Sequence, residues 1–330
     1  MAIPDALRAR LTLPVIASPL FLVSGPELVI AQCKAGIIGS FPALNARPAG
    51  VLDDWLAQVT EELAAWDAAH PEALSAPFMV NHVVQASNLR LEADLLACER
   101  YKVPYAITSL GAREEINAGI HAYGGQVFHD VISDRFARKA IEKGADGLIA
   151  VAAGAGGHAG SQSPFALVQE IREWFDGPLV LGGCIASGRS ILAAQMMGAD
   201  FAYVGSPFIA TRESMAPEGH KQAVADARAE DTVYTSLFTG VPANYLRSGV
   251  LSSGLDPDNL PQGADGKMEW SGDGSSKKKV WKDIWSCGQG VAPITEILPA
   301  AEMIARFRTE YRRARDVGRD LLWTEWRRDP

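Results

Sequence analysis

The stretch Lys143-Gly-Ala-Asp-Gly-Leu-Ile-Ala-Val-Ala-Ala153-Gly-Ala-Gly-Gly-His158-Ala-Gly160 decides the fold. The glycine that follows Lys143 can close a helix in the left-handed conformation. The apolar run at 147–153 is typical of a parallel strand that is buried on both faces. Four glycines then surround His158 and allow the backbone to approach a ligand closely. This stretch therefore predicts a helix end, a buried strand and a site loop in succession.

Similar apolar runs recur along the chain, and helical patterns separate them. The predicted strands cover 14–19, 37–41, 78–84, 105–110, 126–131, 147–153, 178–183 and 201–205. The predicted helices between them cover 53–69, 89–101, 135–143, 165–175 and 190–197. Eight strands within about 210 residues match a (β/α)8 TIM barrel better than an open doubly wound sheet. We therefore predict an α/β fold of the TIM-barrel type.

The bulk composition limits the classes of partner. The chain has 330 residues, 48% of them hydrophobic, and a net charge of −8, which argues against nucleic acid and anionic membrane partners. No apolar run approaches the roughly 20 residues that a membrane span needs, and the N-terminus lacks a signal-peptide pattern. Four widely spaced cysteines predict free thiols rather than a disulfide or metal framework. We expect a cytoplasmic protein that binds small molecules.

The pattern changes after Thr211. We predict a barrel over residues 1–211 and a smaller, mostly helical substrate or lid region over 212–330. The helical segments expected there are 218–230 and about 294–326. The region is expected to cover the barrel mouth, and packing of its last helix back on the barrel is one arrangement left open. The long loop at 255–279 is expected to influence which substrates enter, and its lysine run at 277–279 to form a solvated loop tip.

Polar and glycine residues gather where the predicted strands end. Parallel barrels carry their active sites at this edge. The strand-end residues are Asn81, His82, Thr108, Ser109, His129, Gly182, Gly183, Gly205 and Ser206, with His158 just beyond the sixth strand. The last two strand ends are the usual phosphate site of such barrels, because glycine N–H groups at a helix start bind anions. The alternative for these two turns is an ordinary pair of capped βα connections.

Three motifs carry a family resemblance. The glycine–histidine segment 156–160, the segment 204–213 (Val-Gly-Ser-Pro-Phe-Ile-Ala-Thr-Arg-Glu) and the segment 285–291 (Trp-Ser-Cys-Gly-Gln-Gly-Val) resemble the nitronate monooxygenases, formerly called 2-nitropropane dioxygenases. The resemblance runs from about Leu13 to the C-terminal region. It implies an FMN-binding barrel with a helical substrate domain. The chain departs from the family where an acidic residue often precedes the histidine, since Gly154 and Ala155 stand there.

The resemblance also implies residue roles. His158 would act near the reactive face of the flavin, as a general base or as a cation that holds an anion; the alternative is a loop histidine with a structural role. Gly183, together with Gly182 or Cys184, and the pair Gly205 and Ser206 would hold the phosphate. The full set of residues expected to bind FMN is Pro19, Leu20, Phe21, Asn81, His129, Gly156, Gly157, Gly182, Gly183, Cys184, Gly205, Ser206 and Gln289.

The implied reaction is oxidation of alkyl nitronates, and of neutral nitroalkanes if these are accepted, by O2 to a carbonyl compound and nitrite. One alternative is a flavin-dependent enoyl-acyl-carrier-protein reductase, which would need NAD(P)H. A second alternative is a flavin-binding protein without turnover. The physiological substrate and the oligomeric state, with a homodimer as one candidate, stay open.

Overall fold

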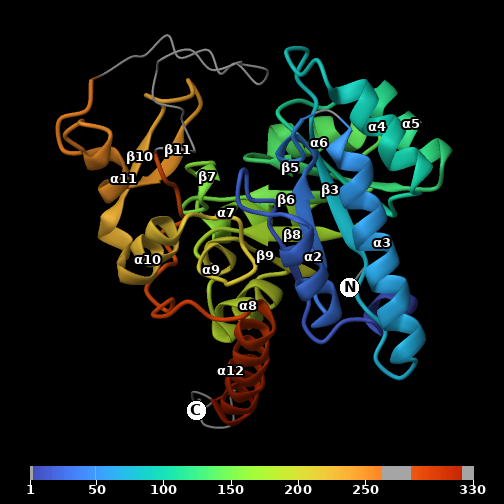
Figure 1. Ribbon diagram of the computed structural model, residues 1–330. Coiled ribbons are helices and arrows are strands. Elements are labelled where there is room, and N and C mark those ends of the chain that lie inside the picture. Colours follow the sequence, from blue (N-terminus) through green and yellow to red (C-terminus); the bar gives the residue numbers. More distant parts are fainter. Residues whose placement is uncertain (1–2, 49, 262–283, 322–330) are drawn as a thin grey trace.

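Eight parallel strands form the centre of the molecule (Figure 1). The computed structural model describes residues 3–48, 50–261 and 284–321. The strands follow the order β1-β9-β8-β6-β5-β4-β3-β2, and a parallel bridge between Ile16 and Ile38 brings β1 next to β2. Their bounds are β1 Val15–Ala17, β2 Gly39–Pro42, β3 Phe78–Val83, β4 Tyr105–Ser109, β5 Gln126–Val131, β6 Gly147–Val151, β8 Leu179–Gly182 and β9 Phe201–Val204. The predicted TIM-barrel fold and all eight predicted strands are confirmed.

Helices cover the outside of the barrel. They are α1 Asp5–Arg8, α2 Pro26–Lys34, α3 Val51–Ala69, α4 Leu91–Arg100, α5 Glu114–Ala122, α6 Asp134–Glu142, α7 Pro164–Arg172, α8 Gly188–Met196 and α9 Ser206–Ile209, with a 3-10 turn at Ala43–Asn45. The five predicted barrel helices are confirmed within a few residues of their ends. The sequence analysis missed α5, because it buries only Asn117 and Ile120 and so lacks a clear apolar stripe. None of the helices in the described ranges is long and apolar enough to span a membrane.

The barrel interior changes character along its axis. Apolar side chains from several strands pack together inside, among them Met79, Ile107, Phe128 and Phe201. Side chains two positions further along a strand point to the same face. Those positions, nearer the carboxyl ends of the strands, hold Asn81, Ser109, Asp130 and Tyr203. The barrel interior is therefore apolar toward the amino ends of the strands and polar near their carboxyl ends, where a ligand would lie.

A second region packs beside the barrel mouth (Figure 1). It contains α10 Glu218–Asp226, a 3-10 turn at Ala229–Asp231, β10 Thr232–Thr235, β11 Ala243–Leu246 and α11 Arg247–Ser252. The strands β10 and β11 form a three-stranded antiparallel sheet with β7, which is the dipeptide Gly157–His158 of the barrel loop. The sequence analysis predicted no strands here, and its helix at 218–230 extends beyond the end of α10 at Asp226. Most of the loop at 255–279, including the lysine run, lies outside the described residues.

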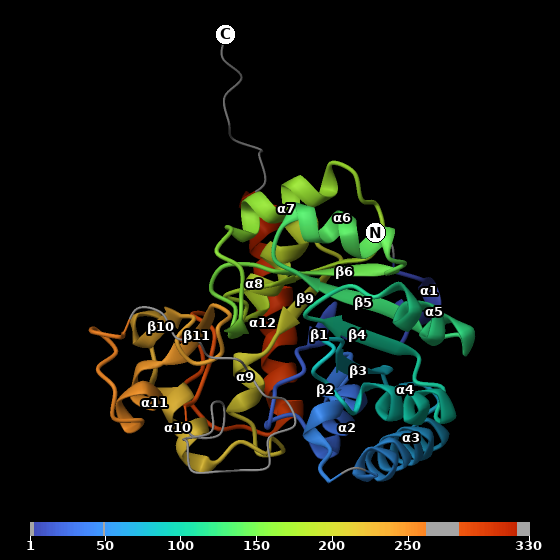
Figure 2. The same cartoon turned by 90° about the horizontal axis from the view of Figure 1, so that it is seen from above.

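The last described helix, α12 (Ala300–Leu321), runs beside α8 (Figure 2). Its apolar residues Met303, Ile304 and Phe307 belong to the same core cluster as side chains of the barrel strands and α8. Gly188 makes this approach feasible, because a Cβ there would lie only 2.2 Å from the carbonyl oxygen of Phe307. The predicted continuation of this helix to residue 326 lies outside the described residues.

Candidate active site

A cavity of about 710 Å³ opens at the carboxyl ends of the barrel strands. Small-molecule sites usually have volumes of about 300–1,000 Å³. The predicted site residues that line the cavity are Pro19, Leu20, Phe21, Asn81, His129, Gly156, Gly157, His158, Gly182, Gly183, Cys184, Gly205 and Ser206. Gln289 is not among the lining residues; its backbone N–H donates to the carbonyl of Gly154 at 2.9 Å. The structure thus brings together strand ends that are far apart in the sequence.

The loop that carries His158 is held by the second region. We call residues 154–160 the glycine loop. His158 lies opposite Ala243 in the register between β7 and β11. The Asn244 side chain donates to the carbonyl of Ala155 at 2.7 Å, and the Tyr234 hydroxyl donates to the carbonyl of Ala159 at 2.8 Å. The position of His158 therefore depends on contacts with a segment about 85 residues further along the chain.

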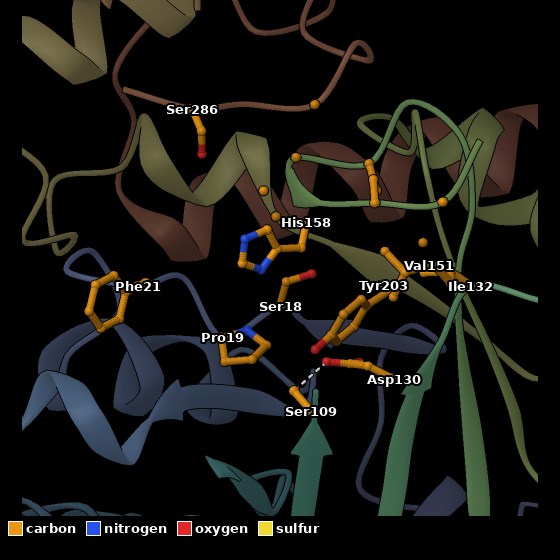
Figure 3. A pocket seen from close by; sticks show the side chains of 18 of the residues that line it. Ser18, Pro19, Phe21, Ser109, Asp130, Ile132, Val151, His158, Tyr203 and Ser286 are labelled. Carbon is orange, nitrogen blue, oxygen red and sulfur yellow. Dashed lines mark hydrogen bonds between the residues drawn. The ribbon is translucent and has the colours of Figure 1, made fainter. Parts of the chain in front are cut away.

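The hydroxyl of Thr239 is one hydrogen-bond partner of His158. Its Nε2 lies 3.0 Å from Oγ1 of Thr239, and this oxygen lies 2.9 Å from the carbonyl oxygen of Val241. A threonine hydroxyl has one hydrogen. When it donates to the Val241 carbonyl, it accepts from Nε2–H of His158. Burial lowers the pKa of His158 to about 4, which keeps the imidazole neutral near pH 7, the form that can accept a proton. The ring points into the space above Ser18 and Pro19 (Figure 3).

Several glycines around the site are needed for contact between chain segments. A Cβ at Gly156 would lie 2.7 Å from the backbone nitrogen of Gly288, and one at Gly288 would lie 2.8 Å from the carbonyl oxygen of Gly154. A Cβ at Gly290 would lie 2.7 Å from Cα of Cys184. Gly156 therefore also allows the segment 287–290 to pack directly against the glycine loop.

The turns that follow β8 and β9 differ in which backbone groups they leave available to a phosphate. At the start of α8, the backbone N–H of Gly188 donates to the Glu310 carboxylate at 2.8 Å. This helix start is thus already capped by an acidic side chain from α12. Gly183, with φ +135°, lies against the carbonyl of Ala153, and Gly205 precedes α9. Any phosphate grip at this end of the barrel must therefore rely on the turns at Gly183 and Gly205 and not on the start of α8.

The loop after β1 is fixed by one buried amide. The Asn45 Nδ2 group donates to the carbonyl of Leu20 at 2.9 Å and to that of Ser24 at 2.8 Å, while its Oδ1 accepts from the backbone N–H of Leu22 at 2.8 Å. These bonds hold Leu22 at φ +61°. The predicted contact residues at 19–21 therefore sit on a rigid loop, and Asn45 is a supporting residue that the sequence analysis missed.

The cavity floor contains an acid that the sequence analysis also missed. Asp130 lines the cavity, and its Oδ2 accepts a hydrogen bond of 2.5 Å from the Ser109 hydroxyl. Ser109 in turn accepts from the Asn81 side chain at 2.7 Å. Burial raises the pKa of Asp130 to about 7, against the lowering effect of Ser109. Figure 3 shows Tyr203 beside this carboxyl group. Burial, and to a smaller extent the Asp130 charge, raises the pKa of Tyr203 well above its ordinary value.

His129, the neighbouring residue predicted to bind the cofactor, directs its ring elsewhere. Its Nδ1 lies 2.6 Å from Oγ1 of Thr108 on the adjacent strand. Since Phe128 points into the barrel, His129 points toward the outer helices and Asp130 points inward. His82, on β3, also faces outward, with its Nε2 at 3.5 Å from the Cys98 sulfur. Strict two-residue alternation from the interior Phe128 is the signal that would have selected Asp130.

The second region contributes another histidine. His220, on α10, lines the cavity and stacks on Trp285 with ring centroids 5.4 Å apart. Its Nε2–H donates to the carbonyl of Ser286 at 3.1 Å, and burial lowers its pKa to about 4. It therefore also stays neutral near pH 7. The sequence analysis did not select it because nothing in the segment 218–226 placed this helix at the mouth.

The mouth of the cavity is apolar. Ile132, Phe136 and Tyr234 line it and remain 43%, 49% and 44% exposed. Lys139 adds a cation at the same rim. Exposed apolar side chains gathered around an opening are typical of a surface that contacts a ligand.

Comparison with known proteins agrees with this geometry. Residues 44–310 match the family described as nitronate monooxygenase. The chain belongs to the nitronate monooxygenase family. The resemblance inferred from the glycine loop and from segments 204–213 and 285–291 is thereby confirmed. Members of this family are oxidoreductases and flavoproteins.

Two curated relatives illustrate the range of similarity. The nitronate monooxygenase of Paraburkholderia phytofirmans is 24% identical over 349 residues, which cover 91% of this chain and 93% of the relative. The (3aS,4S,5R,7aS)-5-hydroxy-7a-methyl-1-oxo-octahydro-1H-indene-4-carboxyl-CoA dehydrogenase of Rhodococcus jostii is 27% identical over 240 residues, which cover 73% of this chain. The match spans 64% of that dehydrogenase, slightly less than two thirds of its length.

Solved structures share the fold. FabK from Thermotoga maritima has a TM-score of 0.76 at 23% identity, over 96% of this chain and 98% of that one. The nitroalkane oxidase from Streptomyces ansochromogenes has a TM-score of 0.71 at 24% identity, over 94% and 99%. At these identities the similarity shows a common architecture.

Proposed function

We propose that this protein is an FMN-dependent enzyme that oxidises alkyl nitronates with O2 to a carbonyl compound and nitrite. The observation that carries the proposal is His158, a neutral imidazole held at the cavity by Thr239 in a member of the nitronate monooxygenase family. A neutral imidazole is the form that can accept a proton from a carbon acid.

The cavity fits a flavin nucleotide in size and in polarity. Its volume of about 710 Å³ can hold a planar ring system. A Cβ at Gly205 would lie 3.3 Å from its nearest neighbour, the side chain of Leu20. Because Gly205 has no Cβ, the backbone of this turn stays accessible beside the loop that follows β1. In the floor, Asp130 Oδ1 and the Tyr203 hydroxyl are buried polar atoms without a partner among the described residues. Buried polar atoms are nearly always paired in native proteins, so a ligand with a polar edge would satisfy them.

The residues of the chain would then divide the work. FMN, when bound, supplies the redox chemistry by accepting electrons from the substrate and passing them to O2. His158 removes the α-proton of a neutral nitroalkane, and Thr239 orients its ring through the contact with Nε2. Lys139 at the rim attracts the anionic nitronate. The turns at Gly183 and Gly205 hold the phosphate.

A second candidate function is NAD(P)H-dependent reduction of an enoyl thioester. The apolar rim of Ile132, Phe136 and Tyr234 favours it, because a small nitroalkane needs less apolar contact than a long acyl chain does. A flavin-binding protein without turnover is the third candidate.

Product analysis separates these candidates. The FMN-loaded protein should release nitrite and a carbonyl compound from a pre-ionised nitronate in air, without added nicotinamide cofactor. If nitrite does not appear and NADPH is instead consumed with an enoyl thioester, the reductase function replaces the proposal. Failure of the flavin-loaded protein with both substrate sets would favour the third candidate.

A further inference from the structure

The floor of the cavity contains two buried polar atoms that the protein leaves unsatisfied. They are Oδ1 of Asp130 and the hydroxyl oxygen of Tyr203, and neither has a hydrogen-bond partner among the described residues. Tyr203 is only 9% exposed. Burying such a group without a partner costs free energy. Two of them lining one cavity indicate that a ligand completes the arrangement.

The other polar side-chain groups of this floor already hydrogen-bond to one another. Ser109 donates to the other carboxyl oxygen of Asp130 at 2.5 Å, and Asn81 donates to Ser109 at 2.7 Å. These bonds fix the carboxyl group and leave Oδ1 for a donor from the ligand. The Asn81 and Ser109 side chains thus orient the Asp130 carboxyl group. Asp130 and Tyr203 each present one hydrogen-bonding atom without a partner among the described residues.

The ring of Tyr203 is also positioned by its surroundings. Gly182 lies opposite Tyr203 in the register of β8 and β9. A Cβ at Gly182 would lie 3.2 Å from Cδ1 of Tyr203, so the glycine leaves room for the ring. The hydroxyl thereby reaches the level of Asp130, as Figure 3 shows. Burial, and to a smaller extent the charge of Asp130, raises the pKa of this phenol and favours its protonated form.

Asp130 Oδ1 and the Tyr203 hydroxyl together require a ligand of a particular hydrogen-bonding pattern. An ionised Oδ1 accepts one hydrogen bond, and a protonated phenol donates one. A ligand edge that satisfies both must present an N–H donor next to a carbonyl acceptor, as a cyclic imide does. The oxidised flavin ring has one N–H group, at N3, and carbonyl groups on both sides of it.

We propose that Asp130 and Tyr203 bind the imide edge of the flavin, with Asp130 Oδ1 accepting from N3–H and the Tyr203 hydroxyl donating to an adjacent carbonyl oxygen. This inference rests on the proposed function, because it takes a flavin as the occupant. It assigns to Asp130 and Tyr203 a cofactor-orienting role that the motifs in the sequence did not indicate.

Binding of two flavins to the apoprotein tests the assignment without any turnover. 3-Methyl-FMN carries a methyl group in place of the N3 hydrogen of FMN and so cannot donate from N3. We expect the wild-type protein to bind FMN tenfold to a hundredfold more tightly than 3-methyl-FMN, which is roughly the worth of a hydrogen bond to a charged group. Asp130→Ala should reduce this preference to less than about threefold. Asp54→Ala, an exposed acid on α3, is the matched control and should keep the wild-type preference.

Tyr203→Phe provides the second arm. Removing the hydroxyl should weaken FMN and 3-methyl-FMN equally, by about fivefold to tenfold, because the carbonyl acceptor is present in both flavins. The preference for FMN should therefore survive in this variant. A variant that selectively lost binding of FMN would contradict the assigned roles.

The wild-type comparison alone can overturn the proposal, even if a variant fails to fold. Equal affinity of the wild-type protein for FMN and 3-methyl-FMN would exclude the N3–H contact, and an unchanged preference in folded Asp130→Ala would exclude Asp130. The proposed reaction is judged separately: tight, N3–H-dependent binding of FMN without nitrite production would support the floor assignment and contradict the nitronate activity.

Discussion

The floor and the rim of the cavity are built in different ways. The floor joins Asn81, Ser109 and Asp130, which lie on the consecutive strands β3, β4 and β5. At the rim, His158 is held by Thr239 and Ala243 of the second region, far along the chain. The floor is therefore fixed by the register of the barrel, whereas the rim depends on how the second region docks. We expect changes at the floor to alter ligand binding and changes at the rim to alter turnover.

The strongest test of this division is His158→Asn. The variant should bind FMN as the wild type does but lose about 10²–10⁴-fold of its turnover on neutral nitroalkanes, the usual worth of general-base catalysis. Pre-ionised nitronates are the control substrates, since their α-proton is already gone. Steady-state rates with both forms measure the difference. Wild-type rates on the neutral nitroalkane would show that His158 is not the base.

Gly205→Asp tests the turn assigned to the phosphate. A carboxylate about 4 Å from a phosphate charge costs up to about 4 kcal/mol near a protein surface, so FMN affinity should fall roughly 100-fold or more. Gly205→Ala is the matched control, because its Cβ would meet Leu20 at 3.3 Å, where a slight shift suffices. Fluorescence titration with FMN gives both affinities. If the Gly205→Asp variant still bound FMN fully, the phosphate could not lie at this turn.

Asp130→Asn should stabilise the apoprotein in a pH-dependent way. The folded pKa of Asp130 is about 7, above its ordinary value of 3.8, so the folded state binds the proton more tightly. Its stability contribution is then complete below pH 4 and is lost as the pH rises toward 7. The substitution should add about 2 kcal/mol to the free energy of unfolding at pH 8, after allowance for partial solvent screening.

Denaturant unfolding between pH 5 and 8 measures this gain. It should be smaller at pH 5 than at pH 8 and should level off above pH 7. Asp54→Asn, an exposed acid far from the cavity, should show no such trend. A gain that is constant with pH would mean that Asp130 has an ordinary pKa in the folded protein.

Thr239→Val tests the rim at a distance from the reacting atoms. It removes the oxygen that lies 3.0 Å from His158 Nε2, so the ring loses a contact that orients it. Turnover on neutral nitroalkanes should fall about tenfold, since even small misplacement of a catalytic group is costly. FMN affinity should stay unchanged. A similar fall with pre-ionised nitronates would point to general damage at the rim rather than to the orientation of His158.

The sequence was most informative where local patterns determine structure. Buried strands and glycine-capped helices follow from short-range periodicity, so the barrel and the position of His158 beyond β6 could be predicted. Alternation from Phe128 would in addition have selected Asp130, which shares the inward face of β5 with Phe128.

Other features depend on contacts that no local pattern reveals. The dipeptide strand β7 forms only because β11 pairs with it, and Glu310 of α12 caps the start of α8 from 122 positions away. His220 reaches the mouth for the same reason, since the packing of the second region positions α10. Such long-range contacts determine the rim, and for this reason the rim was predicted less completely than the barrel.

Anaerobic mixing of the FMN-loaded protein with a nitronate tests the central claim most directly. The visible absorbance of the bound flavin should bleach on mixing with the nitronate, and it should stay unchanged when NADPH is added instead. Bleaching by NADPH with no response to the nitronate would contradict the account, because the cavity would then serve a nicotinamide-dependent reductase.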